Sequence, residues 1–179
     1  MSIGKQILYW TTICTALLAI GCQTTGGAMR TATPPTAAWW YEISFEPVSN
    51  SVHGIDVSRF DPTWDRASAL DANALEGRIS PEELARYLDS ELSLALKSDL
   101  DDDGTPEDVF VGVFSTRDGE RGRFVDITRN GQLLQHFAQT GPSGFSALLD
   151  YEDGVRWYKC MECDEFELIG WSGQSFFLE

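Results

Sequence analysis

The stretch Asp99–Phe114, DLDDDGTPEDVFVGVF, joins an acidic loop directly to an apolar run. Aspartates alternate through its first half as far as Gly104, and the residues from Val109 to Ser115 are almost continuously apolar. A short, nearly continuous apolar run bounded by turn residues predicts a central strand. The carboxylates would repel one another unless a positive charge lay among them. The stretch therefore predicts a cation-stabilised loop that enters the central strand of a sheet.

The oxygen-bearing residues of this loop have the spacing of a hard-cation site. Counted from Asp99, carboxylates stand at the first, third, fifth and ninth positions and a backbone carbonyl at the seventh. The predicted ligands are Asp99, Asp101, Asp103, Thr105 and Glu107. Oxygen ligands at this spacing, with a glycine for the sharp turn, suit Ca²⁺. An EF-hand needs a glutamate at the twelfth position, where this chain has Phe110, so an EF-hand is excluded. A solvated acidic turn that holds no ion is the alternative.

The loop resembles the calcium loop of FG-GAP and VCBS-type repeats, in which DxDxDG leads through an acidic ninth position into an apolar strand ending near a glycine. The matching residues are Asp99, Asp101, Asp103, Gly104, Glu107 and Val111-Gly112. Glu107 replaces the usual aspartate, and Asp108 lengthens the acidic run. The resemblance implies a structural calcium ion and is silent on function. Because the chain has one copy of the motif, a multi-bladed propeller is excluded.

The chain after the loop has the pattern of an antiparallel β-meander. Asn130-Gly131 is the strongest hairpin signal, because a two-residue type I′ turn needs positive φ at both positions. Alternating or apolar runs between turn residues predict strands near 109–115, 124–128, 132–138, 145–151, 156–160, 165–171 and 175–178.

The part of the chain before the loop has fewer signals. Ser80–Glu83 is a capping box with proline at the first helical position, which predicts a helix that ends near Ser90. Asp61-Pro62 predicts a second, short helix, and the alternation in Trp39–Phe45 predicts a strand. Leu92–Ser98 fits either a helix or a strand, and we favour a strand because the acidic loop then connects two strands. The predicted fold is α+β, a mostly antiparallel meander or small open barrel of about six or seven strands with one main helix packed on it.

The N-terminus has the features of an export signal. Lys5 is followed by the uncharged apolar segment Ile7–Ile20, which is too short for a comfortable membrane span. Leu18-Ala19-Ile20-Gly21-Cys22 resembles the lipobox of bacterial lipoproteins, in which a diacylated cysteine becomes the mature N-terminus. The resemblance implies lipidation at Cys22. Gln23 is not the aspartate that resembles an inner-membrane retention signal, so the implied location is the periplasmic face of the outer membrane. An ordinary secretory signal or an uncleaved anchor is the alternative.

These observations divide the chain into three parts. Residues 1–21 are predicted to be a lipoprotein signal peptide, and residues 22–38 the lipidated cysteine with a flexible tether rich in Thr, Gly, Ala and Pro. Residues 39–179 are predicted to form a single β-rich domain. The chain has 28 acidic and 13 basic residues and a formal charge of −15, which argues against nucleic acid as a partner and would steer a basic protein toward it.

Two cysteines remain once Cys14 leaves with the signal and Cys22 carries lipid. Cys160 and Cys163 would lie in an oxidising compartment, which favours a local structural disulfide. A redox-active CxxC needs a lowered thiol pKa, whereas the acidic residues around this motif act in the opposite direction. Zinc would need two further ligands, and the histidines, His53 and His136, have no spacing that supports them.

No catalytic set is recognisable, because the two histidines lie far apart in the sequence and outside any catalytic motif. The sequence predicts a lipid-anchored, non-enzymatic domain that binds or scaffolds in the bacterial envelope, with the membrane reached through its lipid. An acidic inhibitor or immunity-type protein that masks a basic envelope enzyme is the alternative, and a thiol oxidoreductase is a third. The oligomeric state is left open.

Overall fold

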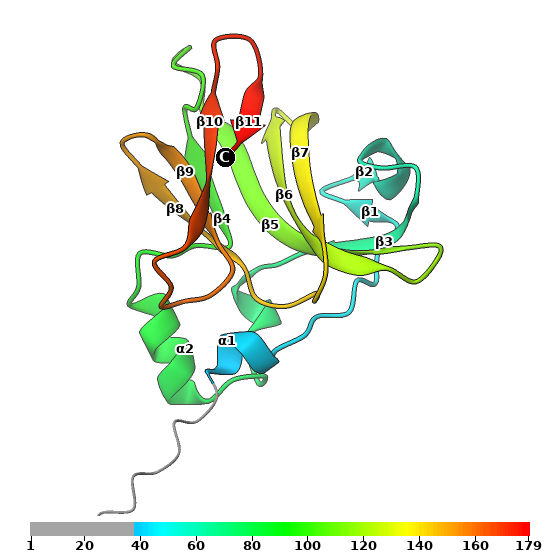
Figure 1. The fold of residues 1–179 in the computed structure, drawn as a ribbon, viewed down its shortest axis with the longest axis vertical. Coiled ribbons are helices and arrows are strands. Elements are labelled where there is room, and N and C mark those ends of the chain that lie inside the picture. The colour runs from blue at the N-terminus through cyan, green and yellow to red at the C-terminus, as the bar shows by residue number, and fades with distance from the viewer. Residues whose placement is uncertain (1–37) are drawn as a thin grey trace, which may run out of the picture. The chain divides into compact units, whose positions relative to one another are not determined.

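A computed structural model describes residues 38–179 (Figure 1). The predicted signal peptide, the lipobox with Cys22 and nearly all of the predicted tether lie outside the described residues. Among the helices of residues 38–179, none has both the length and the apolar character needed to cross a membrane.

The larger sheet has five antiparallel strands organised around β5 (Glu107–Thr116) (Figure 1). Two hairpins continue it on one side, to β6 (Arg121–Arg129) and then β7 (Gln132–Thr140). On its other side, β3 (Trp64–Ala69) pairs with the second half of β5 and β4 (Ala95–Ser98) with the first half. The predicted central strand is therefore confirmed, and its second edge is shared end to end by two short strands.

The point at which β3 and β4 meet is a single residue of β5. The carbonyl of Val111 accepts a hydrogen bond from the amide of Leu70 at 2.9 Å, and its amide donates to the carbonyl of Leu94 at 3.0 Å. The strand favoured for Leu92–Ser98 is confirmed in its second half, where β4 lies, and Ser93 before it forms an isolated bridge with Leu148. This bridge connects the larger sheet to the smaller one.

The smaller sheet has four antiparallel strands in chain order. They are β8 (Ala147–Tyr151), β9 (Gly154–Tyr158), β10 (Phe166–Trp171) and β11 (Phe176–Leu178). These match the four C-terminal strands that the sequence pattern predicts, each within a few residues. A third, two-stranded sheet consists of β1 (Ser51–Val52) and β2 (Ile55–Asp56).

The alternation of side chains along β5 divides the apolar interior into two clusters. Val109, Val111 and Val113 face the main core, which the smaller sheet completes with residues such as Trp157 and Ile169. The intervening positions of β5 face a second, aromatic cluster on the opposite side of the larger sheet. This cluster contains Val52, Ile55, Val57, Phe60, Trp64, Ala67, Phe110, Phe114 and Phe124. The strand is thus buried on both faces, which accounts for its nearly continuous apolar run.

The main helix, α2 (Pro81–Leu88), begins at the predicted capping box. The Ser80 hydroxyl accepts from the Glu83 amide at 3.3 Å, and the Glu83 carboxylate accepts from the Ser80 amide at 2.9 Å. These bonds satisfy two amides that a helix start leaves without partners. Tyr87 buries one face of the helix in the main core. The short helix α1 (Trp39–Glu42) lies at the same end of the domain (Figure 1).

Two predicted elements in the first part of the domain are wrong. Trp39–Glu42 is helical rather than extended, and both Trp39 and Trp40 are only 7% exposed. One face of a strand cannot bury two consecutive side chains, whereas a helix buries neighbours easily. At Asp61-Pro62 the Asp61 carboxylate accepts from the amide and hydroxyl of Thr63, both at 2.7 Å, so this segment is a turn.

The number of strands also differs from the prediction. The described residues contain eleven strands in three sheets instead of six or seven, and these sheets do not close into a barrel. The extra strands are short ones before the acidic loop, together with β3, which begins at Trp64 directly after the Asp61 turn. The mostly antiparallel meander, with few helices, is the part of the predicted fold class that the structure confirms.

Candidate metal centre

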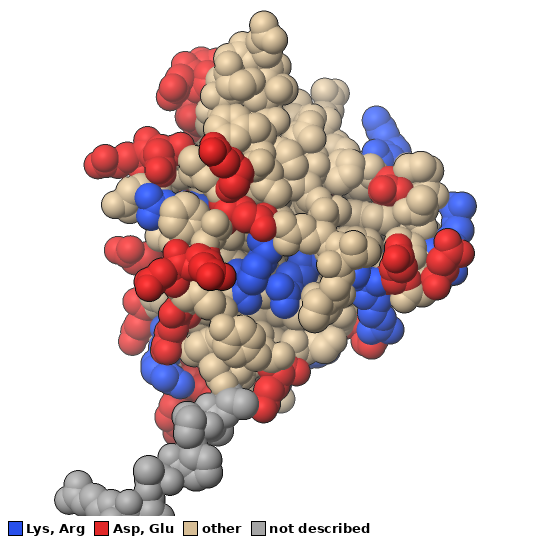
Figure 2. Space-filling model, viewed as in Figure 1, with Lys and Arg blue, Asp and Glu red and all other residues tan. Residues whose placement is uncertain are grey.

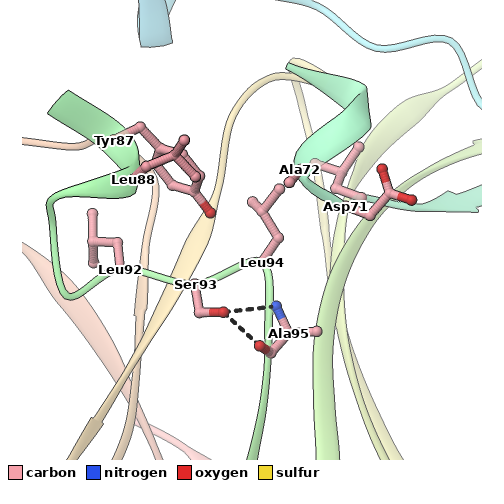
Figure 3. A pocket seen from close by; sticks show the side chains of 9 residues that line it. Asp71, Ala72, Tyr87, Leu88, Leu92, Ser93, Leu94 and Ala95 are labelled. Atoms are coloured by element: carbon pink, nitrogen blue, oxygen red, sulfur yellow. Dashed lines mark hydrogen bonds between the residues drawn. The ribbon is translucent and has the colours of Figure 1, made fainter. Parts of the chain in front are cut away.

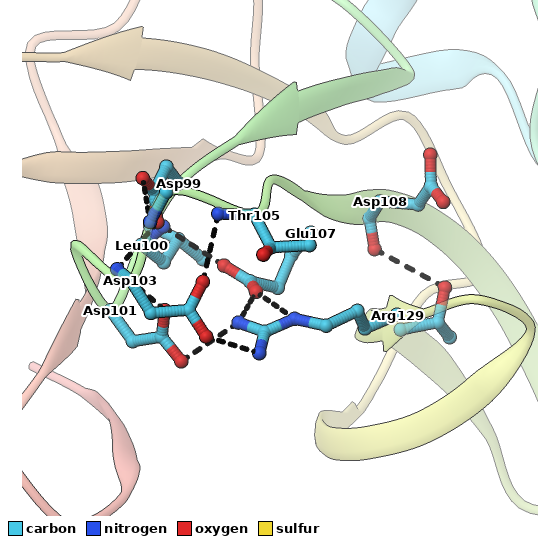
Figure 4. Close-up of polar contacts among 10 residues, drawn as sticks. Asp99, Leu100, Asp101, Asp103, Thr105, Glu107, Asp108 and Arg129 are labelled. Atoms are coloured by element: carbon cyan, nitrogen blue, oxygen red, sulfur yellow. Dashed lines mark hydrogen bonds and ion pairs between the residues drawn. The ribbon is translucent and has the colours of Figure 1, made fainter.

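The acidic loop connects β4 to β5 and is held by its own carboxylates (Figure 4). The Asp99 carboxylate accepts from the amides of Asp103 at 3.1 Å and Gly104 at 2.8 Å, and the Asp103 carboxylate accepts from the amide of Thr105 at 2.8 Å. Asp102 and Gly104 have φ values of 56° and 85°. The alternation of aspartates therefore produces a series of tight turns in which side chains replace backbone partners.

Glu107 is the buried member of the group. Its side chain is 0% exposed although it is charged, and it begins β5 directly after the loop. One carboxylate oxygen accepts from the amide of Leu100 at 2.9 Å, which ties the two ends of the loop together. A buried carboxylate is costly unless a positive charge and hydrogen bonds compensate it.

The compensating charge is Arg129, at the end of β6 (Figure 4). Its guanidinium donates to Asp101 at 2.8 Å, to Asp103 at 2.7 Å and, through Nε, to Glu107 at 2.7 Å. The Arg129 side chain is 22% exposed. These hydrogen bonds, led by the one that Arg129 donates to Glu107, raise the pKa of Arg129, and the bond from the Thr105 amide, assisted by Arg129, lowers the pKa of Asp103.

The structure brings together three of the five predicted ligands. Asp99, Asp101 and Glu107 each offer a carboxylate oxygen, and these oxygens lie within 4.8 Å of one another. Asp103 lies outside this group and faces Arg129, while Thr105 uses its amide in the turn. The donor set consists of oxygen alone, which fits Ca²⁺ and disfavours softer metals. The guanidinium of Arg129 contacts two of the three converging carboxylates, Asp101 and Glu107.

Arg129 is the residue of this site that the loop motif does not reveal. The signal that identifies it is the register of the hairpin between β5 and β6, in which Asp108 pairs with Thr128. One step further along an antiparallel pair, Glu107 and Arg129 stand opposite each other. Opposite charges facing across a strand pair stabilise the sheet.

The cysteines and histidines lie elsewhere. Cys160 and Cys163 are disulfide-bonded, with Cα atoms 5.7 Å apart, and Cys160 is buried in the main core. The ring of His53 packs against Phe110 in a tilted arrangement with centroids 4.1 Å apart, and the ring of His136 lies edge-on to Trp64 at 6.0 Å. Both histidines therefore pack against the aromatic cluster. Burial lowers the pKa of His136.

A second buried carboxylate, Asp126, has no such compensation. It is 0% exposed on β6, between Phe110 and His136 on the neighbouring strands, and neither of its oxygens has a hydrogen-bond partner. Burial raises its pKa well above the usual value. The alternation in this strand places position 126 on a buried face, but the missing partner is visible only in the folded structure.

An apolar hollow of about 310 Å³ lies between α2 and the segment leading to β4 (Figure 3). The Ser93 hydroxyl in this hollow bonds to the backbone of Ala95, and burial raises the pKa of Tyr87 to about 12. Most of the side chains that line the hollow are leucines and alanines, so it offers a ligand few polar contacts.

Comparison with known proteins identifies no relative of this chain. No protein-family model matches the chain, and neither a curated protein nor a solved structure is significantly similar to it.

Proposed function

We propose that the chain is a lipid-anchored, non-enzymatic binding or scaffolding domain of the bacterial envelope, and that its acidic loop is a structural calcium site. The location rests on the lipobox-like sequence that ends at Cys22. The observation that carries the calcium site is the convergence of the Asp99, Asp101 and Glu107 oxygens within 4.8 Å in a loop joining two strands.

Charge supports a cation beyond Arg129. The loop and the start of β5 bring four carboxylates together, from Asp99, Asp101, Asp103 and Glu107, and one guanidinium leaves most of this negative charge uncompensated. A bound divalent ion supplies two further positive charges at this point. Asp99, Asp101 and Glu107 would hold it, and Arg129 would move toward Asp103. The role of these residues is to fix β4 to β5, so the effect of calcium is on stability.

Thermal unfolding of the full chain with and without calcium tests this proposal. We expect calcium, and not magnesium, to raise Tm, because the flexible oxygen ligands suit the larger ion. Asp101→Ala should abolish the increase. Asp102→Gly is the matched control, because it removes a carboxylate from the same loop at a position whose positive φ suits glycine. If Tm is unchanged by calcium in the wild-type chain, the loop is a turn held by Arg129 and by its own hydrogen bonds.

A second function, masking of a basic protein, is favoured by the distribution of charge. Figure 2 shows carboxylates gathered over the side of the domain that carries the acidic loop, the β8–β9 hairpin and α2. A basic envelope enzyme, such as a cell-wall hydrolase, would be attracted to this face. Inhibition of such an enzyme should weaken steeply as salt is added, whereas inhibition that is indifferent to salt would exclude this mode of binding.

A further inference from the structure

Arg123, on β6, differs from the other basic residues of the domain. Within residues 38–179, four Lys or Arg side chains are half-buried, and Arg123 alone among them has no carboxylate within ion-pair distance. Its Nε is buried without a hydrogen-bond partner. Nη2 lies 2.8 Å from the position that a Cβ on Gly144 would occupy, so the glycine makes room for the guanidinium. A half-buried cation without a counter-ion is a costly arrangement unless an anion joins it.

A second cation, Lys159, lies nearby. Its Nζ is 3.1 Å from the centroid of the Trp157 ring and 3.2 Å from the Glu167 carboxylate. Burial lowers the pKa of Lys159 to about 8, and the charge of Arg123 acts in the same direction. The Glu167 carboxylate is also occupied by the side-chain amide of Gln139, at 2.5 and 2.7 Å. Glu167 therefore pairs with Lys159, and the guanidinium of Arg123 is left without a counter-ion among residues 38–179.

Lys159 lines a pocket of about 440 Å³, and Arg123 lies close enough for its charge to act on Lys159. Lys159 and Glu167 line it on the polar side, and the disulfide, Trp157, Tyr41 and Phe166 line the rest. Tyr41 is 71% exposed and Phe166 40% exposed, so two aromatic rings stand open to solvent at its mouth. Small-molecule sites typically combine aromatic walls with a few convergent polar groups.

We propose that this pocket binds a small aryl or alkyl monocarboxylate, whose carboxylate lies beside Lys159 and Arg123 and whose apolar body packs against Tyr41 and Phe166. One negative charge matches the guanidinium of Arg123, which no carboxylate of residues 38–179 pairs with. Glu165 and Glu167 also line the pocket and disfavour a ligand with two or more negative charges. In Figure 2 basic side chains lie in the middle of the view, with carboxylates above and to the left of them.

Calorimetry with phenylacetate and the full chain tests the proposal, with 2-phenylethanol as the neutral analogue. We expect phenylacetate to bind at least about tenfold more tightly than 2-phenylethanol, because the alcohol lacks the charge that pairs with the cations. Arg123→Gln should weaken phenylacetate binding by a similar factor and leave the binding of 2-phenylethanol unchanged. Arg117→Gln is the matched control, because Arg117 is an exposed arginine without an ion pair and the net charge changes equally.

Three results would overturn the proposal. They are the absence of binding at millimolar phenylacetate, equal affinity for the acid and the alcohol, and equal weakening by Arg123→Gln and Arg117→Gln. The last result would mean that the ligand responds to the overall charge of the domain and not to the Arg123–Lys159 cluster. Circular dichroism of both variants verifies that they are folded before binding is compared.

Discussion

Replacement of Asp126 by asparagine should stabilise the protein at neutral pH. Both oxygens of this fully buried carboxylate lack hydrogen-bond partners, and its neighbours across the sheet are Phe110 and His136. Burial lowers the pKa of His136, so no imidazolium is available to compensate the carboxylate at neutral pH. Asparagine has nearly the same shape and carries no charge.

The pH dependence follows from the direction of the pKa shift. The pKa of Asp126 is raised on folding, so the folded state holds its proton at pH values where the unfolded state has lost it. Its contribution to stability is fully present below the unfolded pKa of about 3.9 and is lost as the pH rises, by about 1.4 kcal/mol per pH unit, until the folded pKa is reached. Between the unfolded pKa and about pH 7, the free energy of unfolding lost in this way is at most about 4 kcal/mol.

The free energy of unfolding, measured by urea titration with tryptophan fluorescence near pH 4 and near pH 7, tests this pH dependence. We expect Asp126→Asn to match the wild-type chain near pH 4 and to exceed it by about 1–4 kcal/mol near pH 7, the lower value allowing for the unpartnered amide. Asp118→Asn, in the exposed turn before β6, is the control for the general effect of one charge. A difference between Asp126→Asn and wild type that is constant across this pH range would refute the reasoning.

Three further changes test the packing and the clusters. Arg129→Met in calcium-free buffer should cost about 3–5 kcal/mol of unfolding free energy, because Glu107 is left buried and unpaired, and a loss below about 1 kcal/mol would mean that the pair contributes little. Reduction of the Cys160–Cys163 disulfide should lower the free energy of unfolding by on the order of 2 kcal/mol, and an unchanged urea midpoint would show the bond to be dispensable. Gly112→Ala should cost about 1–3 kcal/mol, since its Cβ would collide with the Phe124 ring; full stability would show that the ring can move aside.

The elements that sequence patterns predict well are those set by local chemistry. The turn at Asn130-Gly131 has φ values of 52° and 74°, as the pair of residues predicts, and the capping box at Ser80 begins α2. The apolar run in β5 predicts a central strand. In the structure its alternate residues enter two different clusters, so both faces of the strand are apolar. In each case the deciding residues are neighbours in the sequence.

The features that could not be predicted depend on partners distant in the sequence. In the sequence, Trp39 and Trp40 resemble the start of a strand. In the fold, Phe145 and the rest of the main core provide a surface that buries both. The acidic loop indicates a positive charge but does not reveal that Arg129 supplies one, because this depends on the register of the β5–β6 hairpin. The missing partner of Asp126 likewise depends on what lies opposite it on two other strands.

The meeting of β3 and β4 at Val111 gives the domain a modular character. Leu70 and Leu94 bond to the same residue of β5, so the segment between them, which includes α2, leaves and rejoins the sheet at a single point. Topologically this segment is an insertion within one edge strand, and its two ends are fixed independently of its length. Lengthening or shortening its exposed parts would leave the register of β5 unchanged, so variation in this segment can alter one surface of the protein without rebuilding the sheet.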